Sequence, residues 1–456
     1  MPNLTWHYHV LLPDAAFRRL LVLRDGDHWT LPGFVMHKRR YWQEVDHVNA
    51  AMRDLLGAQV STLSCLYTRS DPQDGEANLG HVHRLYALEN HDPRWSPPVG
   101  ARWIDRADLD GLALRQPQHR PWIEQWFDEA EGAPLSPLRK DWMRPGWHKQ
   151  AVEWATEQLD KLGIAHEGDF VQLRAWERSY LARVPTREGY IYFKALPPMF
   201  GHEIPLLLMF DGRFPGNFPA LPAADLERRF MLMRDFGGAR LDTVDNLERW
   251  KEALGTLASI QASLSRNVEE LLILGCPDRR LDRVSASMRP FLAGAESHLS
   301  MGHTPFTEDE LARLRALIPR LEDGLAMLGE YGIPPSLDHG DMWPQNIIDR
   351  GDGFLYFDWS DSTVSHPFFS VFYLFGHTDV RLPGGPDAYA RLRDAYLEPW
   401  HVYASMERLR AAFDLSMQLA PLHLVLNYHL TILPGLERKW EMENMVPFFL
   451  RMLLKE

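Results

Sequence analysis

A short polar stretch from Ser336 to Ile348 limits what this chain can fold into more than any other feature. It reads SLDHGDMWPQNII and sets a histidine, two aspartates, a glycine and an asparagine among apolar residues. Such polar side chains do not suit an ordinary core strand, because burying them without partners costs free energy. Asp341 and Asn346 stand five positions apart. The stretch is therefore predicted to be a loop whose polar groups have a chemical task.

A hairpin is expected directly after this loop. Ile347–Asp349 and Phe354–Phe357 are short strand candidates, and the turn-rich segment Arg350–Gly353 lies between them. We take the register that sets Asp349 opposite Phe354. The hairpin then starts at the end of the polar loop.

This register predicts which polar groups meet. Asn346 falls opposite Phe357 and therefore beside Asp358, while Asp341 lies in the loop that leads into the hairpin. An amide oxygen next to a carboxylate suits Mg²⁺, which takes a few protein oxygens together with substrate phosphates. A further carboxylate nearby could accept the proton of a substrate hydroxyl. The plain alternative is an Asx-rich turn with helix and strand caps.

The compound pattern carries a family resemblance. HGD at His339–Asp341, then Asn346, then Asp358 followed by tryptophan resembles the catalytic loop and metal-binding aspartate of the aminoglycoside phosphotransferase-like kinases. These small-molecule kinases share the two-lobed fold of protein kinases. The resemblance implies that Asp341 is the catalytic base and that Asn346 and Asp358 bind Mg²⁺. We expect His339 to orient the loop.

The resemblance covers most of the chain from Trp147 to Glu456 and implies a nucleotide site. Lys194, in a strand candidate, would hold the α- and β-phosphates, and Glu203, at the start of a helix, would orient Lys194. Backbone groups from Met233 to Asp235 would meet the base of ATP or GTP. Taken alone, Lys194 could equally be a solvated strand residue and Glu203 a first-turn residue of a helix.

Two features depart from the usual kinase pattern. The turn between the first two strand candidates, Ala175–Ser179, reads AWERS and contains no glycine, where many kinase lobes cover the phosphates with a glycine-rich loop. Glu203 also follows Lys194 by only nine positions. Asp361 and His366 lie close to the main motif, and we interpret both as structural.

The first part of the chain resembles a different family. WTLPGF at Trp29–Phe34 and ARWIDRADLDGL at Ala101–Leu112 resemble the start and end of a Nudix hydrolase domain, an α/β sandwich. That family holds Mg²⁺ through paired glutamates on a central helix, but the corresponding segment His47–Gly57 contains one carboxylate, Asp54. One carboxylate cannot replace such a cluster. We expect a Nudix-like fold without hydrolase activity, which serves substrate recognition, dimerisation or support.

Together these patterns predict an α/β (α+β) protein with an N-terminal sandwich followed by a two-lobed kinase-like domain. Three short segments rich in β-branched and aromatic residues are predicted to form an antiparallel meander: Phe170–Trp176, Ser179–Val184 and Tyr190–Leu196. The later helical periodicity, such as Leu247, Trp250, Leu254 and Leu257, also fits this order. A Pro-, Gly- and charge-rich stretch marks the junction. The expected parts are residues 1–126 (Nudix-like), 127–146 (linker), 147–238 (N-lobe and hinge) and 239–456 (helical C-lobe).

Composition limits the partners. A formal net charge of -13 argues against a generic nucleic-acid or anionic-membrane surface and leaves cationic small molecules plausible.

Cys65 and Cys276 cannot build a disulfide framework, which favours a reducing compartment. The sequence shows neither a signal-peptide pattern nor a long apolar run, so we expect a soluble, cytoplasmic protein. His81 and His83 are interpreted as surface residues, and the oligomeric state cannot be read.

Two classes of function follow. The first is a kinase that moves the γ-phosphate of ATP or GTP to a hydroxyl of a small molecule, with an aminoglycoside-like acceptor favoured by the negative charge. The second is a catalytically silent, nucleotide-binding pseudokinase or regulatory module. An active Nudix hydrolase is a more distant third.

Overall fold

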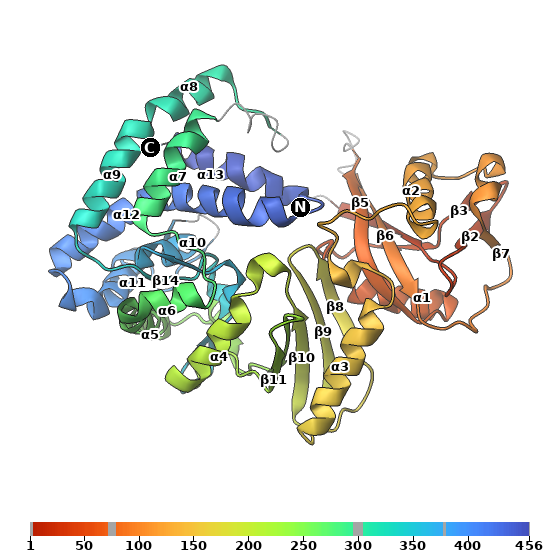
Figure 1. Cartoon of the computed structure of the whole chain (residues 1–456), viewed down its shortest axis with the longest axis horizontal. Helices are drawn as coiled ribbons and strands as arrows, with labels where there is room; N and C mark the ends of the chain where they lie inside the picture. The colour runs from red at the N-terminus through yellow and green to blue at the C-terminus, as the bar shows by residue number, and fades with distance from the viewer. Residues whose placement is uncertain (1–2, 72–78, 295–303, 377–379, 456) are drawn as a thin grey trace. The chain divides into compact units, whose positions relative to one another are not determined.

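The computed structural model describes residues 3–71, 79–294, 304–376 and 380–455 (Figure 1). The chain divides into two units, Met1–Pro197 and Pro198–Glu456. None of the described helices is both long and apolar enough to cross a bilayer.

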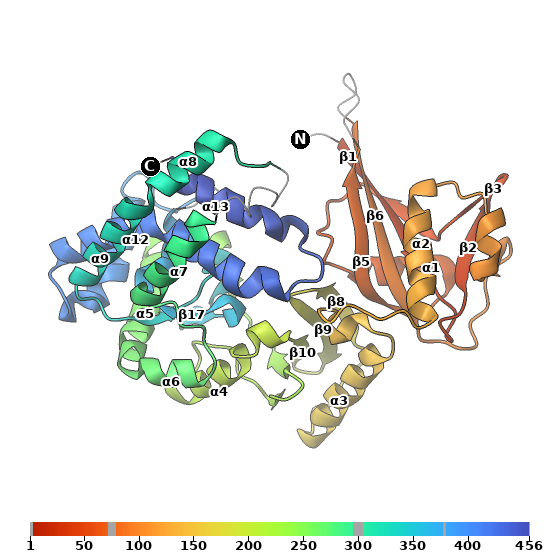
Figure 2. The same cartoon turned by 45° about the horizontal axis from the view of Figure 1, so that its top comes forward.

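The first unit begins with two sheets. Their strands are β1 (Asn3–Leu11), β2 (Leu20–Asp25), β3 (His28–Thr30), β4 (Gly33–Met36), β5 (Val60–Ser70), β6 (Leu79–Asn90) and β7 (Ala101–Ile104). The larger sheet has the order β4-β1-β6-β5 (Figure 2). Strands β1 and β6 are parallel, whereas the pairs β4–β1 and β6–β5 are antiparallel. The smaller sheet has the order β3-β2-β7 and is antiparallel.

Apolar side chains from both sheets and from α2 (Arg120–Ala130) form one core. It consists of Leu11, Leu20, Val22, Leu31, Leu85, Ile104, Leu109, Leu112, Ile123, Trp126 and Phe127. Burial of such side chains is the main favourable term in folding. This core stabilises the N-terminal part of the unit.

Helix α1 (Asp46–Leu56) covers the segment in which the sequence predicted a helix without paired glutamates. Its buried side chains are Val48 and Met52, and it ends at Gly57, whose φ of 67° is left-handed. Glycine adopts this conformation without steric cost, which explains the helix end.

An antiparallel meander completes the first unit. It consists of β8 (Val171–Trp176), β9 (Ser179–Thr186) and β10 (Gly189–Ala195), which confirms the three predicted strands. Helix α3 (Trp147–Lys161) lies along this meander (Figure 1), and its Trp154 ring meets Phe193 at 5.9 Å between centroids.

A neutral hydrogen-bond network joins β8 to the larger sheet, and we call it the joint network. Its members are Asn49 of α1, Thr62 of β5 and Gln172 of β8. Gln172 is buried; its Oε1 accepts from the Thr62 N–H and from Asn49 Nδ2, and its Nε2 donates to the Thr62 carbonyl, each at 2.8 Å. The Thr62 hydroxyl donates to Asn49 Oδ1 at 2.8 Å. Gln172 thus imitates a strand neighbour for Thr62.

The segment expected to be a linker, 127–146, is partly packed. Helix α2 extends through Ala130, and Trp142 and Met143 are buried. The Trp142 indole N–H donates to the carbonyl of Trp176 at 2.9 Å. An indole brings a large apolar surface and one donor, so Trp142 anchors this segment to β8.

The second unit is mainly helical. Its helices are α4 (Glu203–Arg213), α5 (Leu247–Leu264), α6 (Val268–Ile273), α7 (Leu281–Ala293), α8 (Glu308–Ala316), α9 (Ile318–Glu330), α10 (Phe372–Phe375), α11 (Ala388–Leu397), α12 (Met406–Asn427) and α13 (Met445–Leu453). Helices α7, α9 and α13 pack around α12 (Figure 1).

Short strands in this unit carry the polar loop. They are β11 (Ala223–Asp225), β12 (Phe230–Arg234), β13 (Ala239–Arg240), β14 (Ser336–Asp338), β15 (Ile347–Asp349), β16 (Phe354–Tyr356) and β17 (Thr363–Ser365). Strand β15 lies between β13 and β16, and Asp349 pairs with Phe354, which confirms the predicted hairpin and its register. The pairing of β14 with β17, which sets Asp338 opposite Thr363, was not predicted.

Candidate active site

The end of the β15–β16 hairpin brings Asn346 next to Asp358. The backbone N–H of Phe357 donates to the Asn346 carbonyl at 3.1 Å, so the pairing continues one step beyond the strands. Asp358 follows at once with a φ of 63°. A left-handed non-glycine residue is strained, and such strain clusters at functional sites. The predicted neighbours Asn346 and Asp358 are therefore brought together.

The side chain of Asn346 is oriented by the loop. Its Nδ2 donates to the carbonyl of Asp341 at 2.8 Å. A carbonyl oxygen only accepts hydrogen bonds, so the amide atom that faces it has to be the nitrogen. The Oδ1 atom consequently points to the other side of the amide. An oriented amide oxygen of this kind can serve as a metal ligand.

The His339 side chain links the backbone of Asp341 to the backbone of Phe357, which directly precedes Asp358. Its ring is fully buried; Nε2 lies 3.0 Å from the Phe357 carbonyl, and Nδ1 accepts the Asp341 N–H at 3.2 Å. The carbonyl requires a proton on Nε2, and the N–H requires a lone pair on Nδ1, which fixes a neutral tautomer. Burial lowers the pKa of His339 and favours the same neutral form. Both ring nitrogens form hydrogen bonds with backbone groups, as expected for a residue that orients the loop.

Gly340 allows the loop to approach the segment after Asp358. Its φ is 74°, and a Cβ at this position would lie 2.3 Å from the carbonyl oxygen of Asp361. Backbone cannot yield to such an overlap cheaply, so only glycine fits. A steric requirement therefore explains why the central residue of the HGD motif is glycine.

Ser360 connects Asp358 with Glu203. Glu203 is the first residue of α4 and is buried, and its Oε2 accepts the Ser360 hydroxyl at 2.6 Å. The same hydroxyl oxygen lies 3.2 Å from Asp358 Oδ1. Sequence reasoning missed Ser360, because a serine in a turn carries no distinctive signal. Its position between two acidic residues of the motif was nevertheless visible in the sequence DWSD.

The oxygen set fits a divalent cation that completes its shell with phosphate. Within the described ranges no three His, Cys, Asp or Glu side chains converge on a common point. Asn346 and Asp358 instead offer an amide oxygen and a carboxylate. Mg²⁺ is bound in kinases through a few such protein oxygens together with phosphates, so the residues fit this ion.

Of the remaining predicted nucleotide residues, Lys194 and Met233 lie on strands and Asp235 directly follows one. Lys194 belongs to the first unit, where it is buried near the end of β10 opposite Leu181. In the second unit Met233 is buried in β12, and the carboxylate of Asp235 accepts the Gly237 N–H at 3.0 Å. The structure thus gathers Asp341, Asn346, Asp358 and Glu203 in one unit.

His366 has a structural place, as the sequence suggested. It is buried, and its Nδ1 accepts the Phe368 N–H at 3.4 Å, which caps the turn Pro367–Val371. Burial lowers the pKa of His366 to about 3, so the ring is neutral at physiological pH. A neutral, capping histidine is unsuited to proton transfer near neutrality.

An aromatic surface is formed by a tryptophan of the loop that contains Asp341. The Trp343 ring stacks on Tyr373 with centroids 4.7 Å apart and planes 26° apart. Trp343 is half-buried, while Tyr373 is buried. Tyr373 lies in α10. The half-exposed indole offers a flat face close to Asp341.

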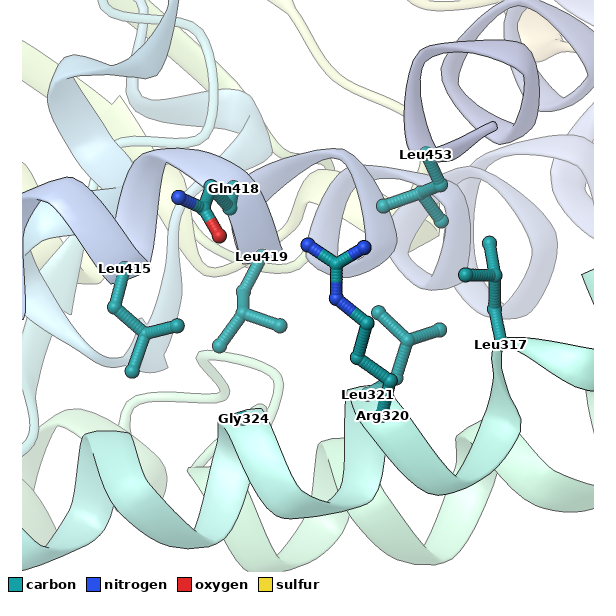
Figure 3. Close-up of a pocket in the computed structure, with 8 residues that line it drawn as sticks. All are labelled: Leu317, Arg320, Leu321, Gly324, Leu415, Gln418, Leu419 and Leu453. Atoms are coloured by element: carbon teal, nitrogen blue, oxygen red, sulfur yellow. The ribbon is translucent and has the colours of Figure 1, made fainter. Parts of the chain in front are cut away.

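A pocket elsewhere in the second unit is separate from these residues. It lies between α9 and α12, with a contribution from α13, and its lining is mostly leucine (Figure 3). None of its lining residues belongs to the catalytic loop. The lining consists of Leu317, Arg320, Leu321, Gly324, Leu415, Gln418, Leu419 and Leu453.

His81 and His83 of the first unit lie in a histidine cluster. His7 Nε2 lies 2.9 Å from His81 Nδ1, and the His7 ring stacks on His83 at 4.7 Å. His83 in turn bonds Asp71 at 3.1 Å. In the described part of the chain, these residues included, no three His, Cys, Asp or Glu side chains are grouped to hold a metal ion.

Comparison with known proteins places the chain in a family. Residues 162–411 match the model of the APH phosphotransferase enzyme family, and the chain belongs to this family. The match confirms the family resemblance read from the sequence and identifies the chain as a phosphotransferase. No curated protein sequence matches the chain.

Solved structures similar to this chain include three phosphotransferases. A macrolide 2'-phosphotransferase of Brachybacterium faecium is 15% identical, with 67% of this chain and 98% of that chain covered and a TM-score of 0.46. A choline kinase of Streptococcus pneumoniae is 14% identical, with 68% and 100% covered and a TM-score of 0.41. An aminoglycoside phosphotransferase of Streptomyces rimosus is 16% identical, with 60% and 97% covered and a TM-score of 0.35.

Proposed function

We propose that this enzyme moves the γ-phosphate of ATP or GTP to a hydroxyl of a small molecule, with Asp341 as the base and Mg²⁺ held by Asn346 and Asp358. The observation that carries the proposal is the linkage within the loop. Asn346 Nδ2 holds the Asp341 carbonyl, and His339 joins the Asp341 N–H to the Phe357 carbonyl. One set of hydrogen bonds therefore fixes the base relative to both metal ligands.

The reaction follows from this arrangement. Asp341 orients the acceptor hydroxyl and takes its proton as the hydroxyl oxygen bonds to the γ-phosphorus. The bond between that phosphorus and the β-phosphate oxygen breaks, and a nucleoside diphosphate leaves. Asn346 and Asp358 would hold Mg²⁺, which when bound would neutralise charge on the β- and γ-phosphates. Asn346 and Asp358 position the phosphates, so catalysis rests mainly on orientation and electrostatics.

Lys194 and Glu203 complete the nucleotide site in this proposal. Lys194 binds the α- and β-phosphates as a buried cation, and Glu203 orients it. Backbone groups from Met233 to Asp235 bind the base. The hydrogen bond from Ser360 to Glu203 ties this carboxylate to the segment of Asp358. Glu203 is thereby fixed relative to the segment of Asp358 within the second unit.

A cationic acceptor, such as an aminoglycoside-like polyamine sugar, fits the site best. The chain has a net charge of -13, which favours cations. The half-exposed ring of Trp343, stacked on Tyr373, adds a face that attracts an ammonium group or packs against a sugar ring. Trp343 lies in the same loop as Asp341, whereas the charge is a property of the whole chain.

The N-terminal domain supports the kinase and is inactive as a Nudix hydrolase in this proposal. Helix α1, which would carry the metal-binding glutamates of an active Nudix enzyme, uses Asn49 to bind Gln172 of β8. A helix engaged in this way is part of the joint with the meander. Cys65 and Cys276 are both buried thiols, which fits a reducing cytoplasm.

Radiolabelled phosphate transfer tests the function. Purified protein is incubated with γ-labelled ATP or GTP, Mg²⁺ and a panel of aminoglycosides, amino alcohols and neutral sugars. We expect a labelled acceptor with the wild type and none with Asp341→Asn. The exposed, nearby Asp352→Asn variant is the matched control and should transfer phosphate normally. Nucleotide binding without transfer to any acceptor or to water would favour the pseudokinase alternative.

A further inference from the structure

Asp338, which directly precedes the catalytic loop, is a carboxylate without exposed surface. Its Oδ1 accepts hydrogen bonds from the Ser370 hydroxyl at 2.9 Å and from the Gly340 N–H at 3.2 Å. Its Oδ2 accepts from the Thr363 hydroxyl at 3.1 Å and from His423 Nε2 at 2.8 Å. We call these residues the loop network. Four donors on one buried carboxylate make a saturated site, and buried charges persist only when so paired.

The donors show that Asp338 is ionised. The Ser370 hydroxyl oxygen accepts from the His339 N–H and from Gln261 Nε2, each at 2.9 Å, so Ser370 turns its own proton toward Asp338. Burial by itself raises the pKa of Asp338, but the hydrogen bond from His423 and the other donors outweigh it and leave the pKa below its ordinary value. The carboxylate is therefore an acceptor at both oxygens.

The partners of Asp338 come from separate elements of the second unit. Gly340 lies in the catalytic loop, Thr363 lies opposite Asp338 in β17, and Ser370 lies in the turn before α10. His423 lies in α12, far along the chain. Asp338 thus connects the start of the loop with a central helix, a role that neither the main motif nor the metal ligands supply.

We propose that Asp338 and His423 are positioning residues, whose hydrogen bond holds the catalytic loop against α12 and thereby sets Asp341 in place. The inference rests on the proposed phosphotransfer function and deepens it. The chain path gives the reason. Asp338 holds Gly340 directly and His339 through Ser370, and Asp341 is the next residue. A shift of about 1 Å in such a base can cost about 10²-fold in rate.

Three variants separate positioning from plain structural support. His423→Leu removes the donor, His423→Gln keeps an N–H near the position of Nε2, and Asp338→Asn removes the charge. Asp349→Asn is the matched control, because Asp349 is paired with Arg249 at the outer end of the hairpin and touches no predicted site group. Thermal unfolding first establishes that each variant is folded at the assay temperature.

Two readouts are compared in the folded variants. Calorimetry gives the Kd of Mg²⁺-ATP and Mg²⁺-GTP. Phosphate release gives kcat for transfer of the γ-phosphate to water. In this reaction a water oxygen bonds to the γ-phosphorus and the nucleoside diphosphate leaves. We expect kcat to fall by about 10²-fold in His423→Leu and Asp338→Asn, with Kd changed by less than about threefold. His423→Gln should recover at least about a tenth of the wild-type kcat, and Asp349→Asn should keep it.

The outcomes distinguish the two levels of the proposal. A wild type without Mg²⁺-dependent binding and turnover would overturn the phosphotransfer function and the positioning role with it. A wild type that turns over, with equal kcat in folded His423→Leu and Asp338→Asn, would overturn the positioning role alone. An equal loss of kcat in His423→Gln and His423→Leu would also contradict it, because the donor would then be irrelevant.

Discussion

The joint network and the loop network are both buried and both hydrogen-bonded, yet they differ in charge. Asn49, Thr62 and Gln172 form the joint network from neutral groups, and each of its bonds is 2.8 Å long. The loop network is centred on the carboxylate of Asp338 and on His423. Neutral amides pair with backbone at little electrostatic cost, whereas a buried carboxylate needs several donors.

This difference shows where the chain contains energetically unfavourable backbone strain and buried charge. The joint network fastens a strand to a sheet, and geometry alone suffices for that purpose. The loop network contains Gly340, at which a Cβ would overlap the Asp361 carbonyl oxygen, and the nearby motif residue Asp358 has a left-handed φ. Backbone strain and buried charge are therefore concentrated around one loop. Such concentration is expected at functional sites rather than at structural joints. Changes in the loop should therefore affect turnover, and changes in the joint should affect stability.

The largest effect is expected from Asp341→Asn. Loss of the base should lower the rate of phosphate transfer by about 10³-fold, since general base catalysis contributes about this much. Nucleotide affinity should stay near the wild-type value, because the metal ligands remain. Steady-state assays and calorimetry measure the two quantities. Asn49→Ala, in the joint network, is the control that should lose stability but keep its rate.

Gly340→Ala should be the most destabilising single change in the loop. The new Cβ would sit at a φ of 74° and 2.3 Å from the Asp361 carbonyl oxygen. Left-handed strain and overpacking together should cost about 4 kcal/mol of unfolding free energy. Gly324→Ala in α9 is the control, since its Cβ would only meet a flexible Leu419 methyl at 3.3 Å. Equal urea midpoints for the two variants would refute the steric account.

Gln172→Ala tests the joint network. The change leaves the N–H and the carbonyl of Thr62 buried without their partner, which should cost about 3 kcal/mol. Phosphate transfer by the folded fraction should be unaffected. Chemical denaturation followed by tryptophan fluorescence measures the loss. The exposed Gln150→Ala in α3 serves as the control, and a similar stability for both variants would show that the joint network contributes nothing.

The smallest effect is expected from Asp349→Asn. Hydrogen bonds from Arg249 hold the pKa of Asp349 below its ordinary value. A lowered folded pKa gives stability that is present above the unfolded pKa of about 4 and is lost as the pH falls through the folded pKa. The variant should lose about 1 kcal/mol at pH 7, with the difference from wild type shrinking below about pH 4. Urea titrations across this range decide, and a constant difference would contradict the linkage.

Local patterns in the sequence predicted those parts of the fold that depend on neighbours along the chain. The β15–β16 hairpin followed from a short turn between apolar residues, and the register assumed for it correctly set Asn346 beside Asp358. The meander with Lys194 on its last strand followed from alternation and turn residues. Short-range rules are sufficient for such elements.

The features that sequence reasoning missed depend on residues far apart in the chain. His423 looked like one more helix residue, and nothing near Asp338 indicates a partner in α12. The packing of Trp142 within the expected linker was hidden for the same reason, since its acceptor lies on β8. A hydrogen-bond partner that is supplied only by tertiary packing leaves no local periodicity to recognise.

Isothermal titration of the protein with Mg²⁺-ATP and Mg²⁺-GTP tests the central claim most directly, with Asp358→Ala and the exposed Asp352→Ala compared side by side. If Asn346 and Asp358 hold the metal that carries the nucleotide phosphates, the wild type and Asp352→Ala bind in a Mg²⁺-dependent manner and Asp358→Ala loses at least about tenfold in affinity. Equal affinity of all three proteins, or no binding of either nucleotide, would contradict the phosphotransfer site described for this loop.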